Sequence, residues 1–243
     1  MPDDTKKYTG IVTGREHLDR ILVGATAAQS QSTSAVVEYE THCALIGTAL
    51  TALFEAATCH RECNKGPHVF EAVCARAYNL GASAYLLAMS GFYDEAANLI
   101  RSIGEISNLV SLSAADPVLF QDWLTSDAET RKKKFSPYKI RMALEKSDGV
   151  QIADEDWYSR FCEGYTHITP HTKPGMHNAA GRGNAGGIFQ LAGLGLALEE
   201  LVTVLVWLAM MVCKFFKFDD LFDDLVHGFE GASAENPTVA ERT

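Results

Sequence analysis

Three histidines in one short segment are the first candidates for chemistry in this sequence. His167, His171 and His177 follow the spacing H-x3-H-x5-H, which matches the extended signature of zinc peptidases. In that signature a glutamate next to the first histidine acts as the general base. Here Ile168 occupies that position, and Pro170 disfavours a continuous helix. We therefore do not expect a zinc peptidase, but a metal-dependent hydrolase that uses some of these imidazoles with a carboxylate remains an alternative.

A second set of polar residues lies within 93–112. With 100° of rotation per residue, five polar side chains share one face of a helix and apolar side chains occupy the other. The polar stripe consists of Asp94, Asn98, Arg101, Glu105 and Asn108. It is either the wet face of a surface helix or the wall of an interior cleft. In a cleft, the Arg101–Glu105 pair would present donors to an anionic ligand, with Asn98 and Asn108 beside it.

Two pairs, Arg160 with His167 and Arg61 with His68, resemble the arginine–histidine signature of HEPN-type ribonucleases, and this resemblance implies metal-independent phosphodiester cleavage. Arg160 precedes His167 by seven positions, and Arg61 precedes His68 by the same interval. In such chemistry the imidazole takes the proton of a ribose 2′-hydroxyl and the guanidinium stabilises the phosphate charge. A spacing this common also arises by chance, so the pattern indicates candidates rather than a site.

The segments GFYDEAANLIRSIGEISNLVSLSAADP and YSRFCEGYTH resemble a family of uncharacterised bacterial all-helical proteins. This family is loosely similar to the HEPN group of helical ribonucleases and defence proteins. The resemblance covers about residues 70–215, and its matching positions are Gly91, Ala96, Leu99, Arg101, Glu105 and His167. It implies that Arg101, Glu105 and His167 converge in one catalytic site. It also implies RNA cleavage in a defence or toxin setting.

The glycine-rich segment GRGNAG, residues 181–186, matches G-x-G-x-x-G. A dinucleotide site would need a preceding strand, and a proline-rich stretch stands there instead. Gly183 and Gly186 could still present backbone N–H groups to an anion near the start of the next helix. The alternative is a flexible connection without a ligand.

Cysteine and histidine also gather in CHRECNKGPH, where Cys59 and Cys63 would share a helix face. Zinc would need four ligands, and the usual C-x2-C knuckle is absent from this segment. We therefore expect free thiols near a helix end, and no cofactor.

The 243 residues are 47% apolar, and the long periodic segments are rich in alanine and leucine. This composition predicts an all-α protein, a single-domain bundle of about seven or eight helices over residues 1–230, followed by a flexible tail at 231–243. A long loop is expected at 169–187. The helices are expected near 13–31, 34–58, 67–90, 93–113, 117–132, 137–146, 154–165 and 188–216, with the second, third, fourth and last forming the core.

The net charge of −10 does not favour a general nucleic-acid binder. One basic segment, 131–146, holds 7 of the 21 basic residues, either as a solvated connection or as a phosphate-binding patch. The apolar stretch 201–213 is too short for a bilayer, which needs about 20 residues, so it predicts a buried core helix and no membrane partner. The start of the chain lacks a secretory signal, so a cytoplasmic location is expected.

The sequence therefore supports three functional hypotheses. The first is metal-independent RNA cleavage by Arg101, Glu105 and His167, with Arg160 as a further catalytic candidate. The second is a non-catalytic helical module that binds a small anionic ligand or forms a homo-oligomer. The third is a metal-dependent hydrolase built on His167, His171 and His177.

Overall fold

The computed structural model describes residues 14–61, 63, 67–170 and 172–235, and every regular element in these residues is helical. The predicted all-α class is therefore confirmed. In chain order the elements are α1 (Gly14–Ala35), the 3-10 helix η1 (Val36–Tyr39), α2 (Glu40–Thr58), α3 (Val69–Met89), α4 (Tyr93–Ala115), α5 (Pro117–Thr125), α6 (Ala128–Lys134), α7 (Pro137–Lys146), α8 (Glu155–Phe161), the π-helix η2 (Cys162–Thr166), α9 (Leu191–Phe216) and α10 (Asp219–Glu235).

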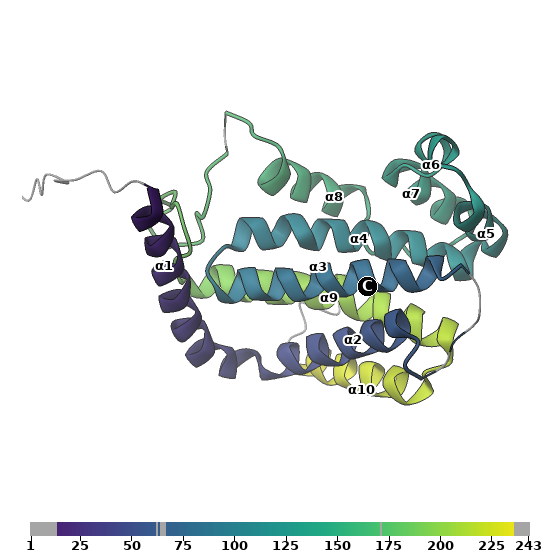
Figure 1. Ribbon diagram of the computed structural model, residues 1–243, viewed down its shortest axis with the longest axis horizontal. Coiled ribbons are helices and arrows are strands. Elements are labelled where there is room, and N and C mark those ends of the chain that lie inside the picture. Colours follow the sequence, from purple (N-terminus) through teal and green to yellow (C-terminus); the bar gives the residue numbers. More distant parts are fainter. Residues whose placement is uncertain (1–13, 62, 64–66, 171, 236–243) are drawn as a thin grey trace, which may run out of the picture.

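The core is formed by α2, α3, α4 and α9, which run side by side along the long axis of the bundle (Figure 1). These are the four helices that the apolar pattern assigns to the core. Helix α10 packs against α2 and α9 and closes the opposite side. Helix α9 is long and apolar enough to cross a bilayer, but 67% of its most apolar window is buried inside the protein. This burial is what a core helix requires.

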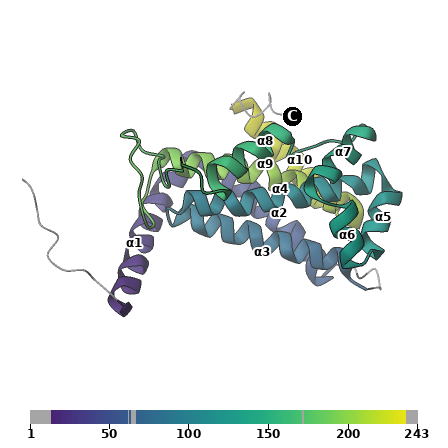
Figure 2. The same cartoon turned by 90° about the horizontal axis from the view of Figure 1, so that it is seen from above.

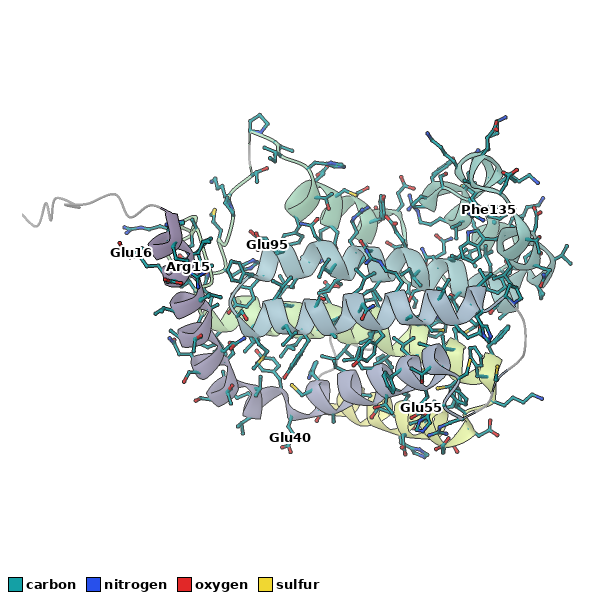
Figure 3. The ribbon with its side chains drawn as sticks, viewed as in Figure 1. Arg15, Glu16, Glu40, Glu55, Glu95 and Phe135 are labelled. Atoms are coloured by element: carbon teal, nitrogen blue, oxygen red, sulfur yellow. The ribbon has the colours of Figure 1, made fainter. Side chains whose placement is uncertain are left out.

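Helix α1 leaves the bundle at one end and points away from it (Figure 2). Its outer end carries Arg15 and Glu16, which lie far from the core helices (Figure 3). Most of α1 is exposed, including the apolar side chains of Leu18, Leu22 and Val23. Exposed apolar side chains that lie together are typical of interaction surfaces. The predicted homo-oligomer remains a prediction.

Three short helices begin at an aspartate that caps the first turn. The carboxylates of Asp116, Asp127 and Asp154 each accept a hydrogen bond from the backbone N–H three residues later, at 3.0, 2.7 and 2.8 Å. Such a cap satisfies an N–H group that has no partner within the helix. The cap at Asp127 explains why the predicted helix over 117–132 is two helices, α5 and α6. The predicted helix at 137–146 is found with the same bounds.

The C-terminal part of the chain differs most from the expectation. Helix α10 was not predicted, and it buries Leu221 and Leu225. Asp219 and Asp220 in its first turn interact favourably with the helix dipole. The helix continues to Glu235, so residues 231–235 are helical rather than part of a tail. Residues 236–243 of the expected tail lie outside the described residues.

The basic segment 131–146 lies on α6, α7 and the turn between them, and most of its side chains are exposed. Lys134 pairs with Asp122 at 3.2 Å on the surface. Arg141 is the exception, because it is 7% exposed and pairs with Glu155 at 3.3 Å. The segment therefore looks like a solvated connection, apart from one buried arginine that anchors α7.

Candidate functional site

The polar stripe of α4 is covered by α8, η2 and the loop that follows them. Figure 1 shows α8 lying along α4 on the side away from α2. All five members of the stripe are buried or partly buried. Each of them contacts this covering layer or bonds to a side chain that does. The stripe is thus neither a wet surface nor the wall of an empty cleft over most of its length.

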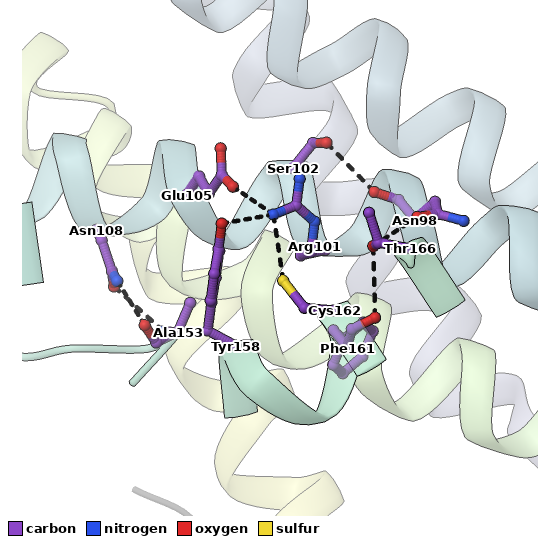
Figure 4. Close-up of polar contacts among 10 residues, drawn as sticks. All are labelled: Asn98, Arg101, Ser102, Glu105, Asn108, Ala153, Tyr158, Phe161, Cys162 and Thr166. Atoms are coloured by element: carbon purple, nitrogen blue, oxygen red, sulfur yellow. Dashed lines mark hydrogen bonds and ion pairs between the residues drawn. The ribbon is translucent and has the colours of Figure 1, made fainter. Parts of the chain in front are cut away.

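Arg101 joins α4 to α8 (Figure 4). One of its terminal nitrogens donates to Glu105 at 2.8 Å and to the hydroxyl of Tyr158 at 2.7 Å, and it also lies 3.7 Å from the Cys162 sulfur. Burial alone would lower the pKa of Arg101, but the charge of Glu105 and the groups of Tyr158 and Cys162 raise it above its usual value. The guanidinium is therefore a fixed cation that holds two helices together.

The side-chain amides of the two asparagines of the stripe form hydrogen bonds within the protein. Asn98 donates to the Tyr165 carbonyl at 2.7 Å and accepts from the Thr166 hydroxyl at 2.8 Å. Asn108 donates to the Ala153 carbonyl at 2.7 Å and accepts two backbone N–H groups. Both asparagines position the covering layer, and neither is arranged to bind a ligand.

His167 follows η2 directly and is exposed. Its backbone N–H donates to the Cys162 carbonyl at 2.8 Å. Within the described part of the chain, no hydrogen bond or ion pair joins its ring to Arg101 or Glu105. The structure thus brings Arg101 and Glu105 together but shows no contact from His167 to either.

A different histidine meets the stripe at its first residue. The Nε2 atom of His177 lies 2.9 Å from Oδ1 of Asp94, and the side chains are only 15% and 18% exposed. The ring of Tyr93 meets the imidazole edge-on, with 5.6 Å between the ring centroids, and the ring of Tyr165 is stacked at 6.4 Å. The imidazole is therefore held by one carboxylate and two aromatic rings.

The loop that carries His177 is fixed around Gly175. The Gly175 N–H donates to Oδ2 of Asp94 at 2.6 Å, and its carbonyl accepts from the side chains of Asn184 and Gln190. Gly175 has a φ of 64°, in the left-handed region that favours glycine. A Cβ there would lie 3.3 Å from the Cβ of Asn184. The conformation that presents this N–H to Asp94 therefore depends on glycine.

His177 and Asp94 lie on the wall of an open cleft of about 870 Å³ between the start of α4, the end of α8, η2 and the following loop. The same cleft is lined by Arg160, Tyr165 and Lys173. Arg160 donates to Glu200 at 2.9 Å and is 47% exposed, so other donors of its guanidinium remain available. Burial and the charge of Asp94 raise the pKa of Tyr165, so its hydroxyl stays protonated at neutral pH.

Replacing Asp94 with asparagine is expected to destabilise the protein in a pH-dependent way. Burial raises the pKa of Asp94, but the hydrogen bonds from His177 and Gly175 outweigh it and the net pKa is lowered. A carboxyl with a lowered pKa stabilises the folded state above its unfolded value of about 4, and this contribution is lost as the pH falls through the folded pKa. Asp94→Asn should therefore lower the free energy of unfolding by about 1–2 kcal/mol at pH 7 and by less at pH 3.

Urea denaturation of both proteins at the two pH values measures this difference. Glu95→Gln is the matched control, because Glu95 is the exposed neighbour of Asp94 (Figure 3). It should change the stability little at either pH. An Asp94→Asn cost of the same size at pH 3 and pH 7 would contradict the assigned role of this carboxylate.

The remaining predicted residues lie apart from this cleft or outside the described chain. His171 is outside the described residues, and no group of three potential metal ligands in the described part includes His167 or His177. Gly183 and Gly186 are exposed. Because α9 begins at Leu191 rather than at Ile188, four residues separate Gly186 from the helix that was expected to follow it.

The sequence-based prediction missed one residue of the cleft and gave two others a different role. His177 was a candidate metal ligand only, Asp94 was a member of the stripe without a role, and Tyr165 was not considered. The only signal for Asp94 was its place on the polar face of α4. No local signal links it to His177, which is 83 positions away in the chain.

No protein-family model matches this chain, and no curated protein or solved structure is significantly similar to it. The resemblance to HEPN-like proteins therefore stays a prediction from short motifs.

Proposed function

We propose that the protein cleaves phosphodiester bonds of RNA without a metal ion, with His177 as the general base and Arg160 as a ligand of the phosphate. The observation that carries this proposal is the Asp94–His177 pair on the wall of a cleft that also contains Arg160 and Lys173. An imidazole oriented by a carboxylate is the usual arrangement of a general base in proteins. Two cations in the same cleft suit a phosphate.

The proposed step uses the nitrogen of His177 that does not face Asp94. Since Nε2 lies beside the carboxylate, it carries the hydrogen, and Nδ1 is the atom that accepts a proton. Nδ1 removes the proton of a ribose 2′-hydroxyl, whose oxygen forms a bond to phosphorus. The bond from phosphorus to the 5′-oxygen breaks, and water protonates this leaving oxygen. The products are a 2′,3′-cyclic phosphate and a 5′-hydroxyl end.

Arg101 and Glu105 take a positioning role in this proposal. They hold α8 against α4, and α8 carries Arg160 to the cleft. This role differs from the convergence with His167 that the resemblance implies. The defence or toxin setting stays a prediction.

The alternative is a non-catalytic protein whose cleft binds a small anion. The observation that favours it is the complete internal use of Asn98 and Asn108 together with the net charge of −10. Both features reduce the surface that could hold a long polyanion.

A cleavage assay separates the two proposals. The protein is incubated with single-stranded RNA and with DNA of the same sequence, in the presence of EDTA. The proposal predicts RNA fragments with cyclic phosphate ends and intact DNA, because DNA lacks the attacking hydroxyl. Cleavage of both polymers, or loss of cleavage in EDTA while the fold stays intact, would contradict it. Saturable phosphate binding without any turnover would favour the non-catalytic alternative.

A further inference from the structure

Cysteine, histidine and glutamate gather at the opposite end of the bundle from the cleft, where α2 is connected to α3 (Figure 1). The ligand atoms of Cys59, Cys63 and His68 all lie within 4.8 Å of one another. The sequence pattern predicts Cys59 and Cys63 on one face of a helix. That prediction is wrong, because α2 ends at Thr58 and the connection begins at Cys59. The turn after the helix brings the two thiols to His68.

Both ends of this connection have an uncommon backbone conformation. Cys59 has a φ of 52° and His68 a φ of 49°, both in the left-handed region. Few residues other than glycine adopt it, and each instance costs of the order of 1 kcal/mol. The two strained residues are the same two that direct a sulfur and an imidazole into the cluster. Such strain persists where another interaction offsets it.

The distances within the cluster fit a tetrahedral ion. The Cys59 sulfur lies 3.7 Å from Nδ1 of His68, and Oε1 of Glu71 lies 3.3 Å from the same nitrogen. Zinc bond lengths in a tetrahedral site give about 3.6 Å between a sulfur and a nitrogen ligand and about 3.4 Å between a nitrogen and an oxygen ligand. Glu71 lies in the first turn of α3, and its side chain is only 11% exposed. Its carboxylate is the candidate for the fourth ligand, next to the three groups whose ligand atoms all lie within 4.8 Å of one another.

Ionised thiols at this end of the bundle would need a cation. Two sulfurs and a carboxylate so close together repel one another once they are ionised. A divalent ion would remove this repulsion and stabilise both thiolates.

We propose that Cys59, Cys63, His68 and Glu71 bind a structural zinc ion that ties the end of α2 to the start of α3. Two thiolates and an imidazole favour zinc over magnesium or calcium, which prefer oxygen ligands. Four protein ligands close the coordination sphere, as in structural rather than catalytic zinc sites. This site is independent of the proposed RNA cleavage.

Metal analysis of the full chain tests the proposal. The purified protein, free of any affinity tag, is reduced, incubated with zinc sulfate and dialysed before elemental analysis. One zinc ion per chain is expected for the wild type, and Cys63→Ser should lose it. Two matched controls should keep the zinc: Cys43→Ser, a half-buried thiol of α2, and His60→Ala, an exposed histidine that pairs with Glu55 instead.

Cobalt substitution and melting temperatures complete the test. Co²⁺ in the wild type should give the intense visible bands of a tetrahedral site with sulfur ligands, and Cys63→Ser should not. Glu71→Gln should weaken zinc binding by about tenfold or more. EDTA should lower the melting temperature of the wild type but not that of Cys63→Ser. A wild type without stoichiometric zinc, or equal zinc content in Cys63→Ser and Cys43→Ser, would overturn the proposal.

Discussion

Replacement of His177 by alanine is expected to lower the rate of RNA cleavage by about 10²- to 10⁴-fold, the usual contribution of a general base. The variant removes the only imidazole that lines the cleft within the described residues. The three residues that position the ring, Asp94, Tyr93 and Tyr165, remain in place. RNA binding should change much less than the rate, because Arg160 and Lys173, the proposed ligands of the phosphate, still line the cleft. Single-turnover rates and equilibrium binding, measured separately, provide the test.

His167→Ala is the matched control for this prediction. It removes the same side chain from an exposed position ten residues earlier in the chain. Its cleavage rate should stay close to that of the wild type. The opposite result, a large loss with His167→Ala and a small one with His177→Ala, would return the general base to the residue that the short motif indicates.

Replacement of Glu200 by alanine is expected to cause a large loss of stability, about 3 kcal/mol in the free energy of unfolding. Glu200 lies on α9 and is 2% exposed. Its two oxygens accept hydrogen bonds from Nε1 of Trp157 at 2.8 Å and from Arg160 at 2.9 Å. The variant leaves the buried indole N–H without its acceptor and removes the partner of Arg160. It therefore weakens the attachment of α8 to the core.

Urea denaturation at neutral pH measures this loss. Glu199→Ala is the control, because it removes the neighbouring carboxylate, which is less buried, and should change the stability by less than about 1 kcal/mol. Glu200→Gln keeps one acceptor for Trp157 and should fall between the two. Equal stabilities of Glu200→Ala and Glu199→Ala would show that the hydrogen bonds from Trp157 and Arg160 to Glu200 do not hold α8 against the core.

The sequence predicts most helices because apolar periodicity and capping residues act over a few positions. The bounds of α7 match the prediction, and α4 begins at the predicted Tyr93. Where the prediction differs from the structure, the cause is a hydrogen bond or a packing contact between helices, which apolar periodicity does not reveal. The π-helix η2 continues α8 because Asn98 on α4 binds its last turn. Helix α10 is stabilised because its apolar residues pack against α2 and α9.

The candidate site is harder to predict from the sequence than the helices are. The polar face of α4 was predicted correctly, but a helical pattern does not say what covers that face. The partner of Asp94 lies in a loop without regular structure, and its position depends on contacts from Gly175, Asn184 and Gln190. The sequence points to Cys59, Cys63 and His68, but free thiols are expected there rather than a zinc site, for a related reason. A helix pattern continued past Thr58 separates Cys59 from His68, whereas the actual turn brings them together.

A crystal structure with an RNA analogue that lacks the attacking 2′-hydroxyl would test the central claim most directly. The account predicts a phosphate within hydrogen-bonding distance of Arg160, with the 2′ carbon of the preceding nucleotide facing Nδ1 of His177. A phosphate bound at the lysines of α6 and α7, or next to His167, with no nucleotide in the cleft, would contradict it.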